Sequence, residues 1–273
     1  MDYFQAVVLG VVEGLTEFLP VSSTGHLTIA EQLLGLEVDD PSVTAFTAVI
    51  QVGAIAAVVL YFYRDIGRIA AAWFRGLVKP EVRGTQDHRM GWYIIGGSIP
   101  IVIVGVLAKD LITGPLRSLW VVAAGLILWS GVMVYAERQA RQARGEDAMT
   151  MRDALMMGVM QCAALVPGVS RSGATISAGL LLGLDRVAAT RMAFFLGIPA
   201  LTAAGLYELK DVHGADLGPT AVGTVVSFVV AYASIAWLLR FVAHHSIAKF
   251  VPYRVGLGLL LIVLLATGVL TAT

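Results

Sequence analysis

The sequence predicts an all-α polytopic membrane protein with an inverted-topology repeat. Each half holds one re-entrant helix pair and three transmembrane helices, giving six spans in a single integral membrane domain over 1–273. Of the 273 residues, 58% are hydrophobic and 14% are charged, whereas soluble domains are about a quarter charged. Apolar stretches of about 20 residues, the length that crosses a bilayer, recur along the chain. Part of the sequence also repeats itself.

The predicted elements follow in order along two repeats, 1–136 and 150–273. Each repeat opens with an apolar stretch that a polar loop interrupts: TEFLPVSSTGH lies within 4–36 and ALVPGVSRSGAT within 154–185. Such breaks are tolerated at membrane depth only where they are buried in protein or face water. We therefore expect both stretches to be re-entrant. The six predicted spans are 43–63, 92–109, 118–136, 190–208, 219–240 and 252–271.

Positive residues orient the spans, because cytoplasmic connections are rich in Lys and Arg. Three segments hold six, four and three such residues, namely 64–91, 137–153 and 240–254, and Arg254 is counted in the last. The connections 109–117 and 209–218 hold three in all. The rich segments are therefore expected in the cytoplasm. The first re-entrant pair then opens outward and the second inward.

The repeat aligns without a gap at a shift of 148 residues, as from Gly10 to Gly158. Ser22 then meets Ser170, and the LLGL run of 33–36 meets that of 181–184. Because each half has an odd number of spans, the second half must be upside down relative to the first. In such folds the broken helices meet near the bilayer midplane, so we expect the two loops to lie together.

Composition excludes several other classes. The 19 basic and 19 acidic residues cancel, so no basic surface for nucleic acid is expected. One cysteine, Cys162, allows neither an internal disulfide nor a cysteine-rich metal site. No Lys or Arg precedes Arg64, which argues against a cleavable signal peptide.

Ionisable groups inside a membrane are expensive and call for an explanation. Glu13 and Glu17 lie four residues apart, on one face of a helix. Two carboxylates in an apolar setting indicate a divalent cation or a shared proton; the alternative is that they line a wet vestibule. Glu31 lies nearer the outer end, where it is expected to be solvated.

The two loops precede predicted helix starts, where backbone N–H groups and hydroxyls form anion sites. Serines there are also ordinary N-caps. Arg171 offers bidentate donors to phosphate, or pairs with a glutamate. His26 is expected in proton transfer or attack. The residues expected to bind phosphate are Ser22, Thr24, Gly25, Ser170, Arg171, Ser172, Gly173 and Thr175.

At these motifs the chain resembles a known family. GVVEGLTEFLPVSSTGH (10–26) and PGVSRSGAT (167–175), together with 46–65 and Ser98–Pro100, resemble the bacterial undecaprenyl-diphosphate phosphatases of the bacitracin-resistance type. The resemblance covers essentially the whole chain. It implies a multi-pass enzyme of the bacterial inner membrane that hydrolyses undecaprenyl diphosphate, recycles the lipid carrier for peptidoglycan and confers bacitracin resistance.

The resemblance also implies roles for individual residues. The family's acidic motif matches Glu13 and Glu17 as ligands of a divalent cation, Mg²⁺ or Ca²⁺. The second repeat has Gln161 and Leu165 instead, so only the first half is expected to hold metal. The catalytic residues expected are Glu17, Ser23, His26 and Arg171.

The sequence leaves open the identity of the nucleophile, a transport function and the oligomeric state. The nucleophile is Ser23, His26 or water, with Glu17 or His26 as the base for Ser23. The orientation places the active site on the extracytoplasmic side. Because inverted repeats with broken helices are typical of transporters, the alternative function is a lipid-carrier transporter or flippase, or both activities. The partners expected are the lipid substrate and membrane lipid, and a homodimer is allowed but not demanded.

Overall fold

The structure is a computed structural model that describes residues 1–38, 40–208 and 216–272. Within these ranges every regular element is a helix, apart from an isolated bridge between Arg144 and Leu184. The expectation of an all-α protein is therefore confirmed. Most of the predicted connection 209–218 lies outside the described residues.

Among the described residues, six helical segments are long and apolar enough to cross a membrane, and each overlaps one predicted span. α5 begins before the predicted span 92–109, α11 extends beyond both ends of 219–240, and α12 ends before the predicted end of 252–271. The six are α3 (Pro41–Tyr61), α5 (Gln86–Leu107), α7 (Leu119–Gln139), α10 (Arg186–Glu208), α11 (Leu217–His244) and α12 (Val251–Ala266), which the preceding 3-10 helix Ile247–Phe250 lengthens to a 20-residue span.

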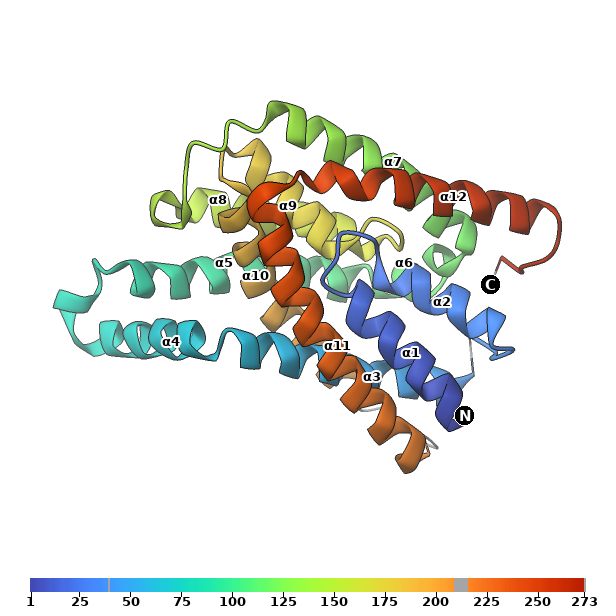
Figure 1. Ribbon diagram of the computed structural model, residues 1–273. Helices are drawn as coiled ribbons and strands as arrows, with labels where there is room; N and C mark the ends of the chain where they lie inside the picture. Colours follow the sequence, from blue (N-terminus) through green and yellow to red (C-terminus); the bar gives the residue numbers. More distant parts are fainter. Residues whose placement is uncertain (39, 209–215, 273) are drawn as a thin grey trace.

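The two interrupted stretches form helical hairpins. α1 (Tyr3–Thr16) packs on α2 (Ser23–Leu33), and α8 (Met151–Gln161) packs on α9 (Arg171–Leu181). None of these helices exceeds 14 residues, which is too short for a bilayer span of about 20 residues. Each hairpin therefore turns at a loop inside the helical body (Figure 1).

The hairpins start with the same N-terminal cap. Asp2 accepts from the backbone N–H of Gln5, and Thr150 accepts from that of Asp153; in both, the third helical residue bonds back to the cap. The two capping boxes lie 148 residues apart, the shift that aligns the sequences. This reciprocal pattern satisfies two of the helix's unpaired N–H groups.

The hairpins also end alike. Gly35 and Gly183 adopt positive φ, at 71° and 86°. The following N–H groups bond back over the helix end, Leu36 to Glu31 O at 2.9 Å and Leu184 to Gly179 O at 3.0 Å. This is the usual glycine-terminated helix end. The sequence repeat is therefore also a repeat of backbone conformation.

Helix α4 (Tyr63–Val78) occupies part of the segment that the sequence indicated only as a positive connection. It packs against α5, and the two lie side by side (Figure 1). Ion pairs fasten this region: Arg191 contacts Glu146 at 2.6 Å and Asp65 at 3.2 Å. These pairs join α10 to α4 and to the segment before α8.

Helices α7 and α12 lie side by side (Figure 1), and α7 packs on α9 of the second hairpin. The loop before α9 approaches α7 closely, because a Cβ added at Gly125 would lie 2.5 Å from the Pro167 carbonyl oxygen. Gly168 in that loop has φ +92°, a conformation that glycine adopts without strain. Two glycines thus let the loop backbone rest directly on α7.

Candidate active site

The two loops between the hairpin helices touch each other. The backbone N–H of Gly168 donates to Ser22 Oγ at 3.1 Å, and Ser170 Oγ donates to the Leu19 carbonyl at 3.4 Å. Ser22 and Ser170 are equivalent in the repeat, and both have positive φ, 77° and 74°. Non-glycine residues in this region store strain and cluster at functional sites.

One carboxylate joins the two hairpins. Ser23 Oγ donates to Glu17 Oε2 at 2.5 Å, and Arg171 Nη2 donates to Glu17 Oε1 at 2.6 Å. The Glu17 side chain is 5% exposed and that of Arg171 is 15% exposed. Because both side chains are largely shielded from water, this ion pair is stronger than one at the protein surface. Arg171 Nη1 also donates to the Gly197 carbonyl of α10 at 3.1 Å, which fixes the guanidinium plane.

His26 lies one helical turn from Ser22 and is engaged at both ring nitrogens. Nδ1 lies 2.6 Å from the Ser22 carbonyl oxygen, and Nε2 lies 2.6 Å from the Tyr253 hydroxyl. Because a carbonyl only accepts, Nδ1 carries the proton; in the neutral ring Nε2 then accepts from Tyr253. The acceptor beside the Ser23 hydroxyl in this arrangement is therefore Glu17 rather than His26.

The hydroxyl groups in and after the second loop form hydrogen bonds at the N-terminal end of α9. Ser170 Oγ accepts from the Gly173 N–H at 3.2 Å and lies 3.1 Å from Ser172 Oγ. Thr175 is fully buried and donates to the Arg171 carbonyl at 2.7 Å. Ser170 therefore caps α9 as well as contacting the first loop. Thr175 supports the backbone that carries Arg171.

The first loop differs from the second. Ser22 makes no side-chain cap for α2, because its hydroxyl accepts from Gly168 instead. The Thr24 side chain is exposed. Gly25 is buried, and an added Cβ would meet Val122 of α7 at 2.6 Å. The absence of a side chain at Gly25 therefore lets the start of α2 pack closely on α7.

Glu13 lies one turn before Glu17 and is 1% exposed. Among the described residues, no group of three or more His, Cys, Asp and Glu side chains is placed to hold a metal ion. Mg²⁺ is commonly bound by one or two carboxylates together with substrate phosphates. The chemistry of this carboxylate pair therefore fits a cation that binds together with a diphosphate. Glu31, expected to be solvated, is buried at 5% exposure.

Two residues at the start of α12 were not identified from the sequence as part of the site. Tyr253 contacts His26, as described, and its ring stacks on the imidazole with centroids 5.6 Å apart. Arg254 was counted with the cytoplasmic charges of 240–254, and that interpretation is wrong because its side chain is fully buried among the loops. Arg254 is a charged residue within the otherwise apolar sequence of α12, and this was the signal in the sequence that could have identified it.

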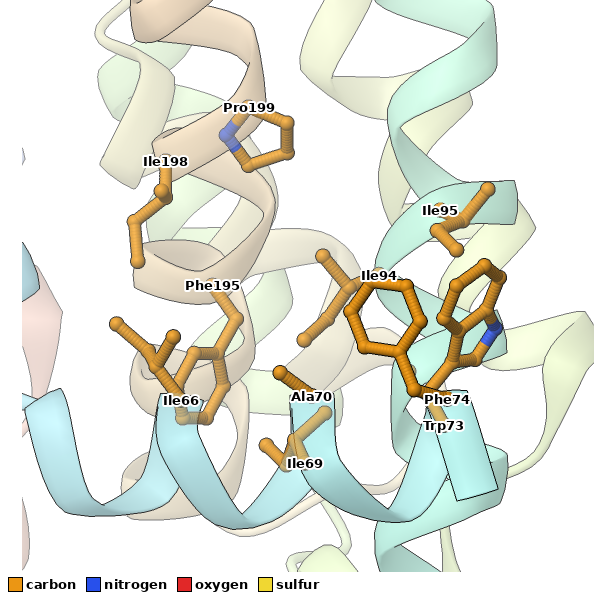
Figure 2. Close-up of a pocket in the computed structure, with 11 residues that line it drawn as sticks. Ile66, Ile69, Ala70, Trp73, Phe74, Ile94, Ile95, Phe195, Ile198 and Pro199 are labelled. Carbon is orange, nitrogen blue, oxygen red and sulfur yellow. The ribbon is translucent and has the colours of Figure 1, made fainter. Parts of the chain in front are cut away.

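An apolar pocket lies between α4, α5 and α10 (Figure 2). Phe195, Ile198 and Pro199 line it from α10, on either side of the Gly197 whose carbonyl binds Arg171. The other lining residues are Ile66, Ile69, Ala70, Trp73, Phe74, Gly91, Ile94 and Ile95. The pocket suits an apolar chain, and the helix that lines one side of it, α10, also supplies the Gly197 carbonyl that accepts from Arg171.

Comparison with known proteins places the chain in a family. The family model described as bacitracin resistance protein BacA matches residues 6–260. The chain is 62% identical over 270 residues to undecaprenyl-diphosphatase 1 of Streptomyces avermitilis, covering 98% of each protein. It is 63% identical to undecaprenyl-diphosphatase 1 of Streptomyces coelicolor, covering 97% of each, and 58% identical to the undecaprenyl-diphosphatase of Acidothermus cellulolyticus over both full lengths. The chain is thus a multi-pass membrane protein that belongs to the BacA bacitracin resistance family.

Proposed function

We propose that this protein hydrolyses undecaprenyl diphosphate to undecaprenyl phosphate and inorganic phosphate. The observation that carries the proposal is the meeting of two loops at one buried carboxylate, Glu17, with Ser23 and Arg171 on its two oxygens. A hydroxyl beside an acceptor and a guanidinium suits attack on phosphorus. The names of the relatives, which match nearly the whole chain, support this substrate. The reaction returns the lipid carrier to peptidoglycan synthesis, and it confers bacitracin resistance.

Ser23 is the nucleophile of the proposed reaction and Glu17 is its base. Ser23 Oγ bonds to the terminal phosphorus and its proton passes to Glu17 Oε2, 2.5 Å away. The bond from that phosphorus to the bridging oxygen breaks, and Glu17 gives the proton to the leaving undecaprenyl phosphate. Water then attacks the phosphorus of the phosphoserine, the bond from phosphorus to Ser23 Oγ breaks, Ser23 Oγ takes a proton from the water, and inorganic phosphate leaves.

Arg171 and His26 have supporting roles. Arg171 carries five N–H donors in a planar fork that matches phosphate, and its contacts with Glu17 and Gly197 hold that fork in place. His26 secures the first loop through the Ser22 carbonyl. Attack by His26 predicts a different variant to be inactive, as described in the Discussion.

The proposed site includes a divalent cation, Mg²⁺ or Ca²⁺, held by Glu13 and Glu17. The two carboxylates are one helical turn apart and both are buried, and substrate oxygens would complete the coordination. When bound, such a cation offsets the negative charge of the diphosphate. The second repeat has Gln161 and Leu165 at the equivalent positions, so the proposed ion belongs to the first repeat alone.

The hairpins are proposed to be re-entrant, within two inverted repeats of the bacterial inner membrane. The equivalent capping boxes, helix ends and strained serines support the repeat, and the distribution of Lys and Arg supports the orientation. In this orientation the first hairpin opens outward, so the active site faces the extracytoplasmic side. The isoprenyl chain would extend into the apolar pocket beside α10 (Figure 2).

The test is phosphate release from undecaprenyl diphosphate by purified protein in detergent, with Mg²⁺, with Ca²⁺ and with EDTA. Glu17→Ala and Arg171→Ala should lose the activity. The exposed residues Glu37 and Arg152 provide matched controls, and Glu37→Ala and Arg152→Ala should retain it. No release by the wild type with any cation would contradict the phosphatase and favour the lipid-carrier transporter. Release that survives both site substitutions would place the active site elsewhere.

A further inference from the structure

Arg254 lies at the start of α12, and its side chain is fully buried between the two loops. The guanidinium makes five hydrogen bonds, to one hydroxyl and four carbonyl oxygens. Its acceptors are Ser130 Oγ (3.2 Å) and the carbonyls of Pro20 (2.8 Å), Gly125 (3.4 Å), Gly168 (2.8 Å) and Val169 (3.1 Å). All of these acceptors are neutral groups.

Two of the acceptors are equivalent positions of the repeat. Pro20 and Gly168 lie 148 residues apart, and their carbonyls accept from Arg254 Nη1 and Nη2, both at 2.8 Å. One guanidinium therefore bridges the same backbone group in both loops. A planar fork with two outer nitrogens makes such a bridge, whereas an ammonium offers donors from a single point.

The bridge is close to the reacting groups along the chain. Pro20 precedes Ser23 by three residues, and Gly168 precedes Arg171 by three residues. Ser23 and Arg171 are the two groups that bind the opposite oxygens of Glu17. The position of the two loops relative to each other therefore sets the distance from the hydroxyl to the guanidinium.

Stability alone does not account for this arrangement. Burying a charged group costs several kcal/mol, and apolar residues of similar volume are often as stable or more so. A fully bonded buried polar network, in contrast, specifies one arrangement of the backbone groups that it joins. The five bonds of Arg254 join α7, α12 and both loops.

We propose that Arg254 is a positioning residue that holds the two loops in register, so that Ser23 and Arg171 stay aligned on one phosphoryl group. The activity part of this inference rests on the proposed phosphatase function. Misplacement of reacting groups by about 1 Å lowers a rate about 100-fold. Loss of the bridge should therefore reduce kcat much more than it changes KM.

The experiment compares Arg254→Lys with Arg144→Lys in purified, detergent-solubilised protein. Arg144 is a matched control because it also bonds several groups, Asp153 and the Ala148 and Leu182 carbonyls, away from both loops. Hydrogen exchange of peptides that cover 17–26 and 163–172 reports on the two loops and does not depend on enzymatic activity. Phosphate release gives kcat and KM.

Arg254→Lys should accelerate exchange in both loops together and lower kcat by about 100-fold with little change in KM. Arg144→Lys should lower the melting temperature while leaving loop exchange and kcat as in the wild type. Unchanged loop exchange in a folded Arg254→Lys protein, or faster exchange in one loop only, would overturn the bridge. Wild-type kcat in that variant would overturn the positioning role.

Two further variants keep the test decisive if Arg254→Lys does not fold. Ser130→Ala removes the acceptor of Arg254 Nε and the bond from the Ser130 hydroxyl to the Leu126 carbonyl within α7, and it should give smaller changes in the same directions. Arg254→Ala should regain activity when guanidinium ion is added at low millimolar concentration. No effect of Ser130→Ala together with no rescue would count against the proposal. An inactive wild type would refute the phosphatase while the exchange data still decided the bridge.

Discussion

Ser23 and Arg171 occupy equivalent positions of the two repeats, and they bind the two oxygens of a single carboxylate, Glu17. The equivalent of Glu17 in the second repeat is Leu165, so the symmetric pair of helix starts converges on one acidic group. A hydroxyl and a guanidinium thus take the places that symmetry would give to identical residues. The asymmetry places the proposed nucleophile and the proposed anion binder in different halves.

Ser23→Ala should abolish phosphate release, with kcat reduced at least about 1,000-fold, because it removes the proposed nucleophile. Rapid quenching of the wild type with substrate labelled in the terminal phosphate should trap a label on Ser23. Thr28→Ala, one turn further along α2, is the control and should retain activity. An active Ser23→Ala protein beside an inactive His26→Ala protein would instead identify His26 as the attacking group.

Tyr253→Phe should lower kcat only about fivefold, because it removes one hydrogen bond to His26 Nε2, worth about 1 kcal/mol. The ring stacking would remain. Steady-state phosphate release measures the effect, and Tyr63→Phe, at an exposed tyrosine of α4, is the control. A loss as deep as that of Ser23→Ala would show that the Tyr253 hydroxyl takes part in the chemistry itself.

Acid should destabilise the protein through Asp153. Burial raises the pKa of this carboxyl, but hydrogen bonds from Arg144 and Thr150 outweigh burial and hold the pKa below its ordinary value. A depressed pKa contributes stability above the ordinary value of about 3.9, and this contribution is lost as pH falls through the lowered pKa.

Melting curves of the detergent-solubilised protein from pH 7 to pH 3 measure this effect. Asp153→Asn should melt lower than the wild type at pH 7, and the difference should shrink toward pH 3. A difference that stays constant over this range would show that Asp153 does not contribute through its charge.

Ala70→Trp should raise KM for undecaprenyl diphosphate and change that for a short isoprenyl diphosphate much less. Ala70 lines the pocket between α4 and α10, and an indole there would occupy the space proposed for the chain. Ala71, the next residue, is exposed, so Ala71→Trp is the control. Equal effects on the long and short substrates would argue that the chain lies elsewhere.

The sequence alone predicted the helical class and the six apolar helices, because span length and hydropathy are local properties. It also predicted that the loops around Ser22 and Ser170 meet. It was wrong about Arg254, since counting charges between spans does not show where a long side chain ends. It had no means to find Tyr253, an ordinary aromatic residue near a helix start.

The sequence by itself determined the family, the repeat and the set of polar residues in two apolar hairpins, because these depend on residue type and spacing. Only the tertiary structure decided which groups pair. Glu17 rather than His26 accepts from Ser23, and Arg254 joins the carbonyls of Pro20 and Gly168. These contacts link residues far apart in the chain, and hydrogen bonds act only over about 3 Å. The packing of α2 and α9 against α7, and of α12 against α7, brings those partners within reach.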